Sequence, residues 1–363
     1  MSSQMGNKIK ISVFGQSHSE AIGVVIDGIP AGIEFETDKI KSFMLRRAPG
    51  KNKYSTSRKE EDFPNILSGV LKNKNGNLLS CGAPLCAVIK NTDQKSSDYD
   101  NLRIVPRPGH ADYTAAVKYD GFNDIRGGGH FSGRLTAPIC FAGALAIQIL
   151  ENKGIFIGAH IKSIGDIEDK SFDSMCNDKE IIKSSGFKEF PVIDDSMGKK
   201  MMDLIEEIRL DQDSIGGVIE CCIMGLPVGI GDPMFDGLEN LISRAVFGIP
   251  AVKGIEFGDG FAAARLRGSE NNDAYVMEKD GSVRTLSNHS GGILGGISNG
   301  MPVIFRTAFK PTPSISKPQK SVNLRDLKNE ELVIQGRHDP CIVPRAVPVV
   351  EAAAALAVLD LIV

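Results

Sequence analysis

The alternation of apolar and polar side chains predicts β-strands at several places along this chain. Residues 8–14 alternate and end at a glycine, and residues 301–310 alternate so that their apolar side chains share one face. Two Asx-Gly pairs, Asn75-Gly76 and Asp280-Gly281, each divide two apolar runs. Such pairs are typical of tight turns, so we expect a β-hairpin at each of them.

Apolar positions at helical spacing predict helices in four other regions. Residues 135–150 have no polar face, so this helix should be buried. Residues 194–210 are amphipathic, and residues 348–363 should form a C-terminal helix. A further helix should begin with Asp232-Pro233 as its N-cap and first turn. The charged segment 157–193 is expected to be surface structure.

These elements favour an α+β fold, because hairpins and long helices are mixed without a steady β-α alternation. No linker divides the chain, so we expect one domain over residues 1–363. Hydrophobic residues make up 42% and charged residues 24% of the chain, which is ordinary globular usage. The formal net charge of −3 argues against nucleic acid as the main partner.

The cysteines and the apolar stretches indicate the cellular compartment of the protein. Seven cysteines occur without a C-x-x-C pair or a Cys/His zinc spacing, so we expect reduced thiols and no metal site. The longest apolar stretch, residues 137–150, is too short to span a bilayer, and the N-terminus has no apolar signal region. A cytoplasmic protein without a membrane partner is therefore expected.

Three clusters offer groups for proton transfer. His18 follows a strand that ends in Gly15, and His110 lies with Arg107 and Asp112 around a Pro-Gly turn. Asp339 lies next to an arginine and a histidine, which could hold its carboxylate ionised and oriented. The alternatives are a loop histidine with a structural hydrogen bond and an aspartate that caps a helix.

Three further clusters suit the binding of anions. Residues 46–59 combine arginines, lysines and hydroxyls, although they could also be a solvated loop neutralised by the acidic residues 60–62. The glycine run within 126–134 precedes a helix, where backbone N–H groups can approach an anion. Glycines at 291–296 again permit close backbone approach, and residues 310–314 bring a lysine and hydroxyls to a strand end.

Taken together and in this order, the clusters resemble the chorismate synthase family. The resemblance runs from Phe14 to about Leu359. Its most specific pieces are RPGHADYTAAVKY at 107–119, AVKGIEFGDGF at 251–261, SNHSGGILGGISNG at 287–300 and GRHDPC at 336–341. It implies a lyase of the shikimate pathway that converts 5-enolpyruvylshikimate 3-phosphate to chorismate and phosphate by anti 1,4-elimination. Reduced FMN would be required, without net redox change.

The resemblance also implies roles for individual residues. His18 matches the proton donor to the leaving phosphate, His110 the group that protonates the reduced flavin, and Asp339 the carboxylate that assists removal of the ring proton. The positions that match flavin contacts are His130, Phe131, Ser132, Pro250, Ala251, Gly295, Lys310, Pro311, Thr312, Pro313, Ser314 and Arg337. The positions that match binding of a substrate or NADP phosphate are Arg47, Lys53, Arg107 and Arg134.

Fold and assembly follow from the same resemblance. The family fold is a β-α-β sandwich, two antiparallel sheets that enclose helices, and the family assembles as homotetramers. This chain departs from many members at His130-Phe131, where they have Arg-Ser, and at Lys53, where they have Arg. Two other functions stay open: a bifunctional enzyme that also reduces flavin with NADPH, and an RNA-binding module built on the Arg/Gly segments. The 6% aromatic content disfavours the RNA-binding module.

Overall fold

The computed structural model describes residues 3–48, 62–92, 101–175, 178–334 and 339–363. Its two largest sheets have five strands each, and every strand pair in them is antiparallel. The first sheet has the order β1 (Gln4–Met5), β2 (Lys10–Gly15), β3 (Ala21–Asp27), β8 (Leu85–Lys90) and β5 (Asn65–Ser68). The second has the order β10 (Ile167–Glu168), β9 (Phe156–Ile164), β11 (Gly217–Met224), β17 (Val303–Phe309) and β12 (Val252–Phe257).

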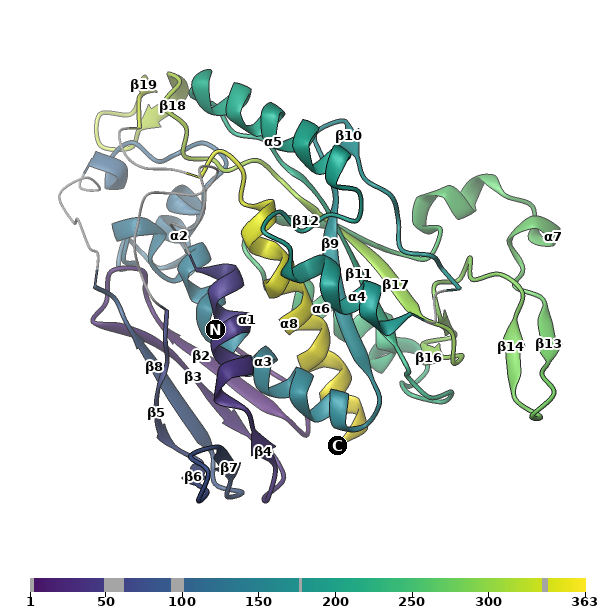
Figure 1. Cartoon of the computed structure of the whole chain (residues 1–363). Coiled ribbons are helices and arrows are strands. Elements are labelled where there is room, and N and C mark those ends of the chain that lie inside the picture. Colours follow the sequence, from purple (N-terminus) through teal and green to yellow (C-terminus); the bar gives the residue numbers. More distant parts are fainter. Residues whose placement is uncertain (1–2, 49–61, 93–100, 176–177, 335–338) are drawn as a thin grey trace.

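Two apolar helices, α3 (Thr136–Asn152) and α8 (Val343–Ile362), form the centre of the molecule (Figure 1). Helix α3 contacts β3 and β8 of the first sheet, α8 contacts β9 and β11 of the second, and the two helices pack on each other. Gly143 of α3 lies against Ala352 of α8, where an added Cβ would be 2.2 Å from that of Ala352. The absent side chain lets the helix backbones approach closely and bring both sheets to one core.

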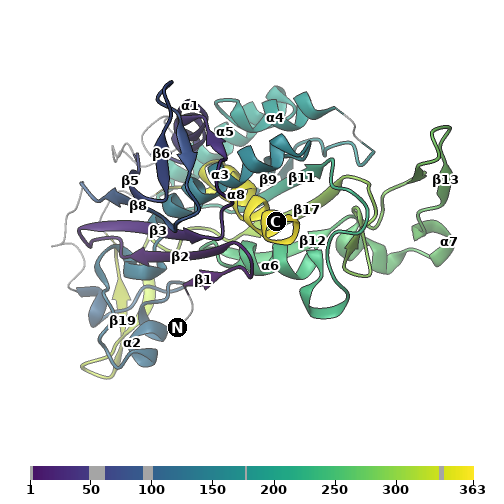
Figure 2. The same cartoon turned by 90° about the horizontal axis from the view of Figure 1, so that it is seen from below.

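The remaining elements surround this centre (Figure 2). The other helices are α1 (Thr37–Arg47), α2 (Asp112–Lys118), α4 (Lys179–Phe187), α5 (Asp195–Leu210), α6 (Leu238–Phe247) and α7 (Gly268–Asn271). The smaller sheets are β4 (Glu34–Phe35) with β7 (Leu78–Ser80) and β6 (Val70–Lys72), β13 (Tyr275–Met277) with β14 (Val283–Thr285), β15 (Ile293–Leu294) with β16 (Ile297–Ser298), and β18 (Gln319–Asn323) with β19 (Lys328–Leu332). Short 3₁₀ segments are η2 (Arg126–Phe131), η3 (Gly133–Leu135), η4 (Met234–Asp236) and η5 (Gly260–Arg265).

The expected mixture of helices and antiparallel hairpins is confirmed. Both Asx-Gly pairs lie in hairpin turns, between β6 and β7 and between β13 and β14. Helix α3 is buried along most of its length, and β17 presents the predicted apolar face. Helix α5 begins after Asp194, whose side chain accepts a hydrogen bond from the Ser196 N–H.

Three expectations about the elements are wrong. Segment 157–193 is not merely surface structure, because β9 lies within the second sheet and most of its residues are buried. Helix α6 starts at Leu238 with Gly237 as N-cap, since Met234 has a φ of 65° that no α-helix accommodates. Helix α8 starts at Val343 instead of Pro348, and Pro348 lies inside it.

One described helical stretch, Gly133–Asn152, is long and apolar enough to cross a membrane by length and composition alone. Its 18-residue apolar window is 83% buried inside the molecule. This burial matches the contacts of α3 with α8 and with the first sheet.

Candidate active site

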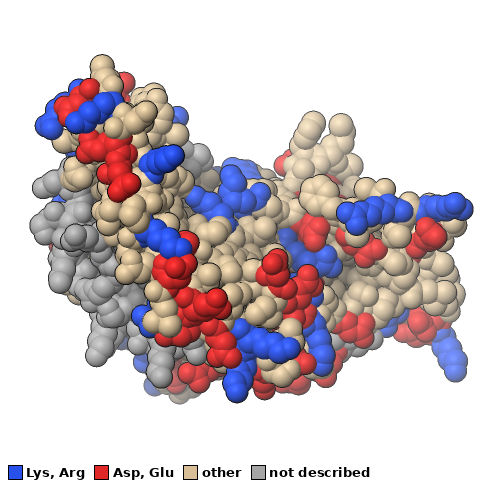
Figure 3. Space-filling view, turned by 90° about the horizontal axis from the view of Figure 1, so that it is seen from above, with Lys and Arg blue, Asp and Glu red and all other residues tan. Residues whose placement is uncertain are grey.

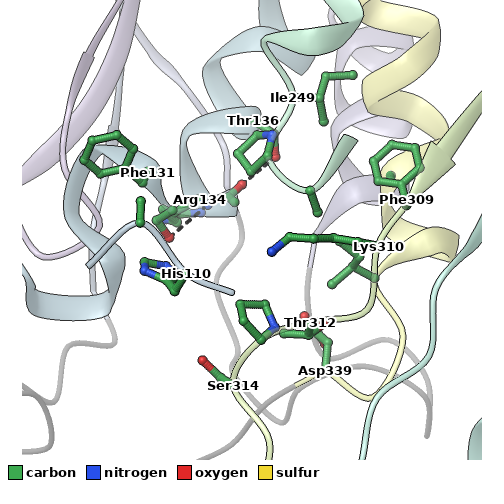
Figure 4. Close-up of a pocket in the computed structure, with 18 of the residues that line it drawn as sticks. His110, Phe131, Arg134, Thr136, Ile249, Phe309, Lys310, Thr312, Ser314 and Asp339 are labelled. Carbon is green, nitrogen blue, oxygen red and sulfur yellow. Dashed lines mark hydrogen bonds between the residues drawn. The ribbon is translucent and has the colours of Figure 1, made fainter. Parts of the chain in front are cut away.

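A cavity of about 580 Å³ opens where the ends of several elements meet. The ends of α1, α6 and β17 contribute to its wall, together with the loop before α2 and the starts of α3 and α8. Figure 4 shows Lys310 extending into the cavity, with His110, Arg134 and Phe131 on the other side. This volume falls in the range of about 300–1,000 Å³ that is usual for ligand sites.

Most of the predicted site residues that the structure describes line this one cavity. They are Arg47, Arg107, His110, His130, Phe131, Ser132, Arg134, Pro250, Ala251, Lys310, Thr312, Pro313, Ser314 and Asp339. Segments that are far apart in the sequence are therefore brought together, as the resemblance implies.

The other predicted residues have different positions. His18 is buried one layer behind the lining, and Pro311 lies between two lining residues. Gly295 occupies the turn between β15 and β16, near the start of α6, whereas the cavity lies at the other end of that helix. Ten helical residues span about 15 Å. Lys53 and Arg337 lie outside the described residues.

His110, Arg107 and Asp112 form a tight cluster on the cavity wall. Asp112, the first residue of α2, accepts hydrogen bonds from Arg107 Nε and Nη2 at 2.7 and 2.8 Å. His110 Nδ1 lies 2.6 Å from Asp112 Oδ1. Burial alone would raise the pKa of Asp112, but the hydrogen bonds and charges of Arg107 and His110 outweigh it and hold this pKa below its ordinary value.

A second buried aspartate joins two arginines of the wall. Asp62 accepts hydrogen bonds from Arg47 Nη1 and from Arg134 Nη1, and its side chain is fully buried. Arg47 also donates to Thr136 Oγ1 at 3.1 Å, and Arg134 to Asn91 Oδ1 at 3.0 Å. Burial raises the pKa of Asp62, but the two guanidinium charges lower it further, so the carboxylate is kept charged. The arginines are thereby fixed side by side.

Asp339 is oriented by Arg345 from the first turn of α8. Arg345 Nη1 donates to Asp339 Oδ2 at 2.6 Å, and Arg345 Nε donates to the Arg47 carbonyl at 3.1 Å. Burial lowers the pKa of the Arg345 guanidinium from its ordinary value. This arginine links the predicted carboxylate to the end of α1.

The glycine run packs against two histidines. Gly127, Gly128 and Gly129 all have positive φ, at 58°, 85° and 53°. A Cβ on Gly127 would lie 2.4 Å from the His18 ring, and one on Gly128 would lie 3.0 Å from His110 Nε2. The run thus provides space beside both imidazoles. The sequence predicts only that its backbone N–H groups could approach an anion.

Lys310 and His130 both line the cavity, and both side chains bind a backbone carbonyl. The Lys310 ammonium donates to the Gly109 carbonyl, and burial, with a smaller effect from the Lys253 charge, lowers the pKa of Lys310. His130 Nδ1 lies 2.8 Å from the Gly15 carbonyl and Nε2 lies 2.8 Å from Ser3 Oγ. Because a carbonyl only accepts, the hydrogen of His130 is on Nδ1, and both ring nitrogens are engaged outside the cavity.

The sequence motifs did not single out several residues of the wall. Thr136 and Arg345 line the cavity and Asp62 lies behind it, but none of the three has a role predicted from the motifs. The apolar part of the lining comes from Phe247, Ile249, Phe309, Ile342, Ala346 and Val349. No short motif marks these residues, but Arg345 could have been found, because it follows Asp339 at the start of a helix.

The wall of the cavity carries more positive than negative side chains, unlike the chain as a whole. Among the described lining residues, Arg47, Arg107, Arg134, Arg345 and Lys310 stand against the carboxylate of Asp339. On the face shown in Figure 3, acidic and basic side chains are interspersed. Although the chain has a net charge of −3, the wall of this cavity favours anions.

An α+β chain with arginines, a histidine and a carboxylate around one cavity is an enzyme that acts on an anionic small molecule. The family model of chorismate synthase matches residues 9–363, so the chain belongs to the chorismate synthase family.

Individual relatives agree over nearly the whole chain. The chorismate synthase of Lancefieldella parvula is 47% identical over 370 residues, covering 99% of this chain and 96% of the relative. That of Thermococcus kodakarensis is 44% identical over 356 residues, covering 98% and 96%. A solved structure described as "Crystal Structure of Chorismate Synthase" matches with a TM-score of 0.76 and 26% identity, covering 98% of this chain and 92% of that one.

Proposed function

We propose that this chain is the lyase that converts 5-enolpyruvylshikimate 3-phosphate to chorismate and phosphate, the last step of the shikimate pathway. The observation that carries the proposal is one cavity that combines His110 and Asp339 with the guanidinium groups of Arg47, Arg107 and Arg134. The substrate carries a phosphate and two carboxylates, and buried arginines are suited to bind such groups.

The lining also suits reduced FMN. Phe131, Ile249 and Ile342 provide apolar surface for a flat ring, while Lys310 and the Ser314 hydroxyl offer polar contacts. We place the flavin against the segments 130–132, 250–251 and 310–314. When bound, the reduced flavin would lend electron density to the substrate and recover it, so that no net redox change results.

The arginines of this chain bind and orient the substrate. Asp62 fixes Arg47 and Arg134 in place, and Asp112 fixes Arg107, so these groups need little rearrangement when an anion arrives. The apolar wall excludes water and strengthens each contact.

Three groups handle protons. Asp339, oriented by Arg345, assists removal of the ring proton, and His110 supplies a proton toward the flavin. His18 lies behind the lining beside Gly127, so its role as donor to the leaving phosphate stays a prediction. Gly295, Lys53 and Arg337 stay predictions as ligand contacts.

We also propose the finer features that the family implies. These are a β-α-β sandwich built as one catalytic domain over residues 1–363, a homotetramer, and a cytoplasmic location without nucleic acid or membrane partners. Reduction of the flavin by NADPH stays a prediction, which oxidation of NADPH by the purified protein with FMN would test.

The decisive experiment measures phosphate release from 5-enolpyruvylshikimate 3-phosphate without oxygen. We expect release with reduced FMN and none with oxidised FMN or without flavin. Chorismate should appear in equal amount in the same samples. Phosphate release that does not depend on flavin would contradict the proposal.

A further inference from the structure

Asp112 contacts two groups of the cavity wall through a single carboxylate. His110 Nδ1 lies 2.6 Å from its Oδ1. The same Oδ1 accepts a hydrogen bond from Arg107 Nη2 at 2.8 Å, and Oδ2 accepts from Arg107 Nε at 2.7 Å and from the Arg107 backbone N–H at 3.1 Å. The residue is 5% exposed. Because a carboxylate only accepts hydrogen bonds, His110 must carry its hydrogen on Nδ1.

Arg107 also approaches the imidazole directly. Its Nη2 lies 3.1 Å from His110 Nδ1, but two donors cannot share a hydrogen bond, so this contact is electrostatic. The positive charge of Arg107 opposes the protonated imidazole, and the negative charge of Asp112 favours it. The two neighbours therefore act on His110 in opposite directions.

The other nitrogen of His110 lies beside Gly128. A Cβ there would be 3.0 Å from Nε2, so the missing side chain keeps this side of the nitrogen open, while Arg107 Nη2 lies 3.4 Å from it. With Nδ1 bound to Asp112, Nε2 is the atom through which His110 exchanges its proton.

We infer that Asp112 is a positioning residue that, together with Arg107, fixes the tautomer of His110 and keeps the imidazole able to gain and lose a proton at Nε2. Asp112 does not act on the substrate itself. The inference deepens the proposed function and rests on it, since it concerns the proton that His110 delivers.

Other charged groups around His110 do not replace Asp112. Lys310, at the end of β17, reaches the Gly109 carbonyl next to the histidine, and it adds positive charge. Across the cavity, Arg134 is paired with Asp62 and Arg345 with Asp339. Within the part of the chain that the structure describes, Asp112 is the carboxylate that contacts His110, so its removal leaves the imidazole facing cations.

The test replaces Asp112 by asparagine, which keeps the size and one acceptor oxygen but removes the charge. We expect kcat to fall by about 10- to 100-fold. This loss is smaller than the full contribution of a general acid, because His110 itself is still present. The alkaline limb of the pH–rate profile should move to lower pH, because the negative charge that favours the protonated imidazole is removed. Asp62→Asn is the matched control, because that buried aspartate also holds two cations but no histidine.

For Asp62→Asn we expect the substrate KM to rise by about tenfold, since the substrate arginines lose their anchor, while the alkaline limb stays in place. A merely structural role of Asp112 would give the two variants the same pH dependence. An unshifted alkaline limb in folded Asp112→Asn would overturn the inference.

A second measurement needs no substrate and no variant. ¹⁵N NMR of the imidazoles in the wild-type protein should show neutral His110 with its hydrogen on Nδ1. Hydrogen on Nε2 would overturn the inference even if Asp112→Asn fails to fold. Because this readout involves neither turnover nor flavin, it separates a failure of the inference from a failure of the proposed function.

Discussion

Two histidines of this chain contact carboxylates and lie near an arginine, and they differ in access to solvent. His110 lies on the cavity wall with Asp112 and Arg107. His160 is fully buried in the second sheet, where Nε2 is 3.2 Å from Glu220 Oε1 and Nδ1 is 3.3 Å from Asp169 Oδ2. The same kinds of side chain thus form a reactive group in one place and a structural connection in the other.

The partners explain the difference. Glu220 also accepts from the Phe172 N–H at 2.6 Å and from Arg306 Nε at 3.0 Å, and the Phe172 ring packs edge-on against His160. His160, Glu220 and Arg306 lie on β9, β11 and β17, and Asp169 and Phe172 lie in the segment after β10. At His110, by contrast, glycine at position 128 leaves one nitrogen accessible. Access, rather than residue type, decides which histidine can perform chemistry.

The largest expected effect is a loss of activity on mutation of the cavity residues, which distinguishes the cavity from the buried His160 network. We expect His110→Ala and Asp339→Ala to lose about 10²–10⁴-fold in kcat, because each removes a proton-transfer group from the cavity. Phosphate release measures the rate, and thermal unfolding serves as the control for folding. Near-wild-type turnover in both variants would show that the proton roles are assigned to the wrong residues.

The cavity cluster was accessible from sequence, because Arg107, His110 and Asp112 fall within six positions. The rest of the cavity wall could not be predicted from the sequence. Asp62 and Arg134 are 72 positions apart, and Arg47 and Arg345 are 298 apart. Pairs at such distances depend on how the sheets and helices pack, which no local spacing reveals.

The same limit applies to the fold. Strand β17 and helix α3 were predictable, because each has an uninterrupted apolar pattern. Strand β9 was not predicted. Its nine residues begin a segment whose high charge as a whole indicated surface structure. His160 therefore has no role predicted from the sequence, although it lies between two carboxylates.

The next largest effect concerns stability. We expect Glu220→Ala to lower the free energy of unfolding by about 3–5 kcal/mol, because it removes the buried carboxylate that His160 and Arg306 share. Glu256→Ala is the matched control, since Glu256 pairs with the same arginine but is 29% exposed. Its expected loss is about 1 kcal/mol or less. Chemical denaturation measures both, and equal losses would contradict the contrast.

The buried histidine should also be visible in the pH dependence of stability. Burial lowers the pKa of His160, but the hydrogen bonds to Asp169 and Glu220 outweigh it and raise this pKa above its ordinary value of 6.5. Because the folded state binds the proton more tightly, the resulting stability is fully present below pH 6.5 and is lost as pH rises through the raised pKa.

His160→Gln tests this dependence. We expect the wild-type protein to exceed the variant in Tm most strongly at low pH, and the gap to narrow as pH rises above 6.5. Measurements should stay above about pH 5, because Glu220 and Asp169 have lowered pKa values and lose their own contribution in acid. A gap that is constant with pH would mean that the imidazole is not charged in the folded protein.

The smallest effect is expected at a third histidine–carboxylate pair. His289 Nδ1 lies 2.7 Å from Asp259 Oδ2, and both side chains are about one-third exposed. Asp259→Asn should change the free energy of unfolding by less than about 1 kcal/mol, because solvent screens such pairs. Denaturant titration measures the change, and a loss as large as that of Glu220→Ala would show that exposure does not rank these pairs.

The position of α8 in the chain has a consequence for biosynthesis. This helix supplies the centre of the core, and its Asp360 accepts hydrogen bonds from the backbone N–H groups of Asn7, Lys8 and Ile9. A ribosome makes those N-terminal residues first and α8 more than 330 residues later. The nascent polypeptide must therefore keep α3 and the second sheet soluble with the apolar surface that α8 later covers still exposed, which makes it a natural client for chaperones.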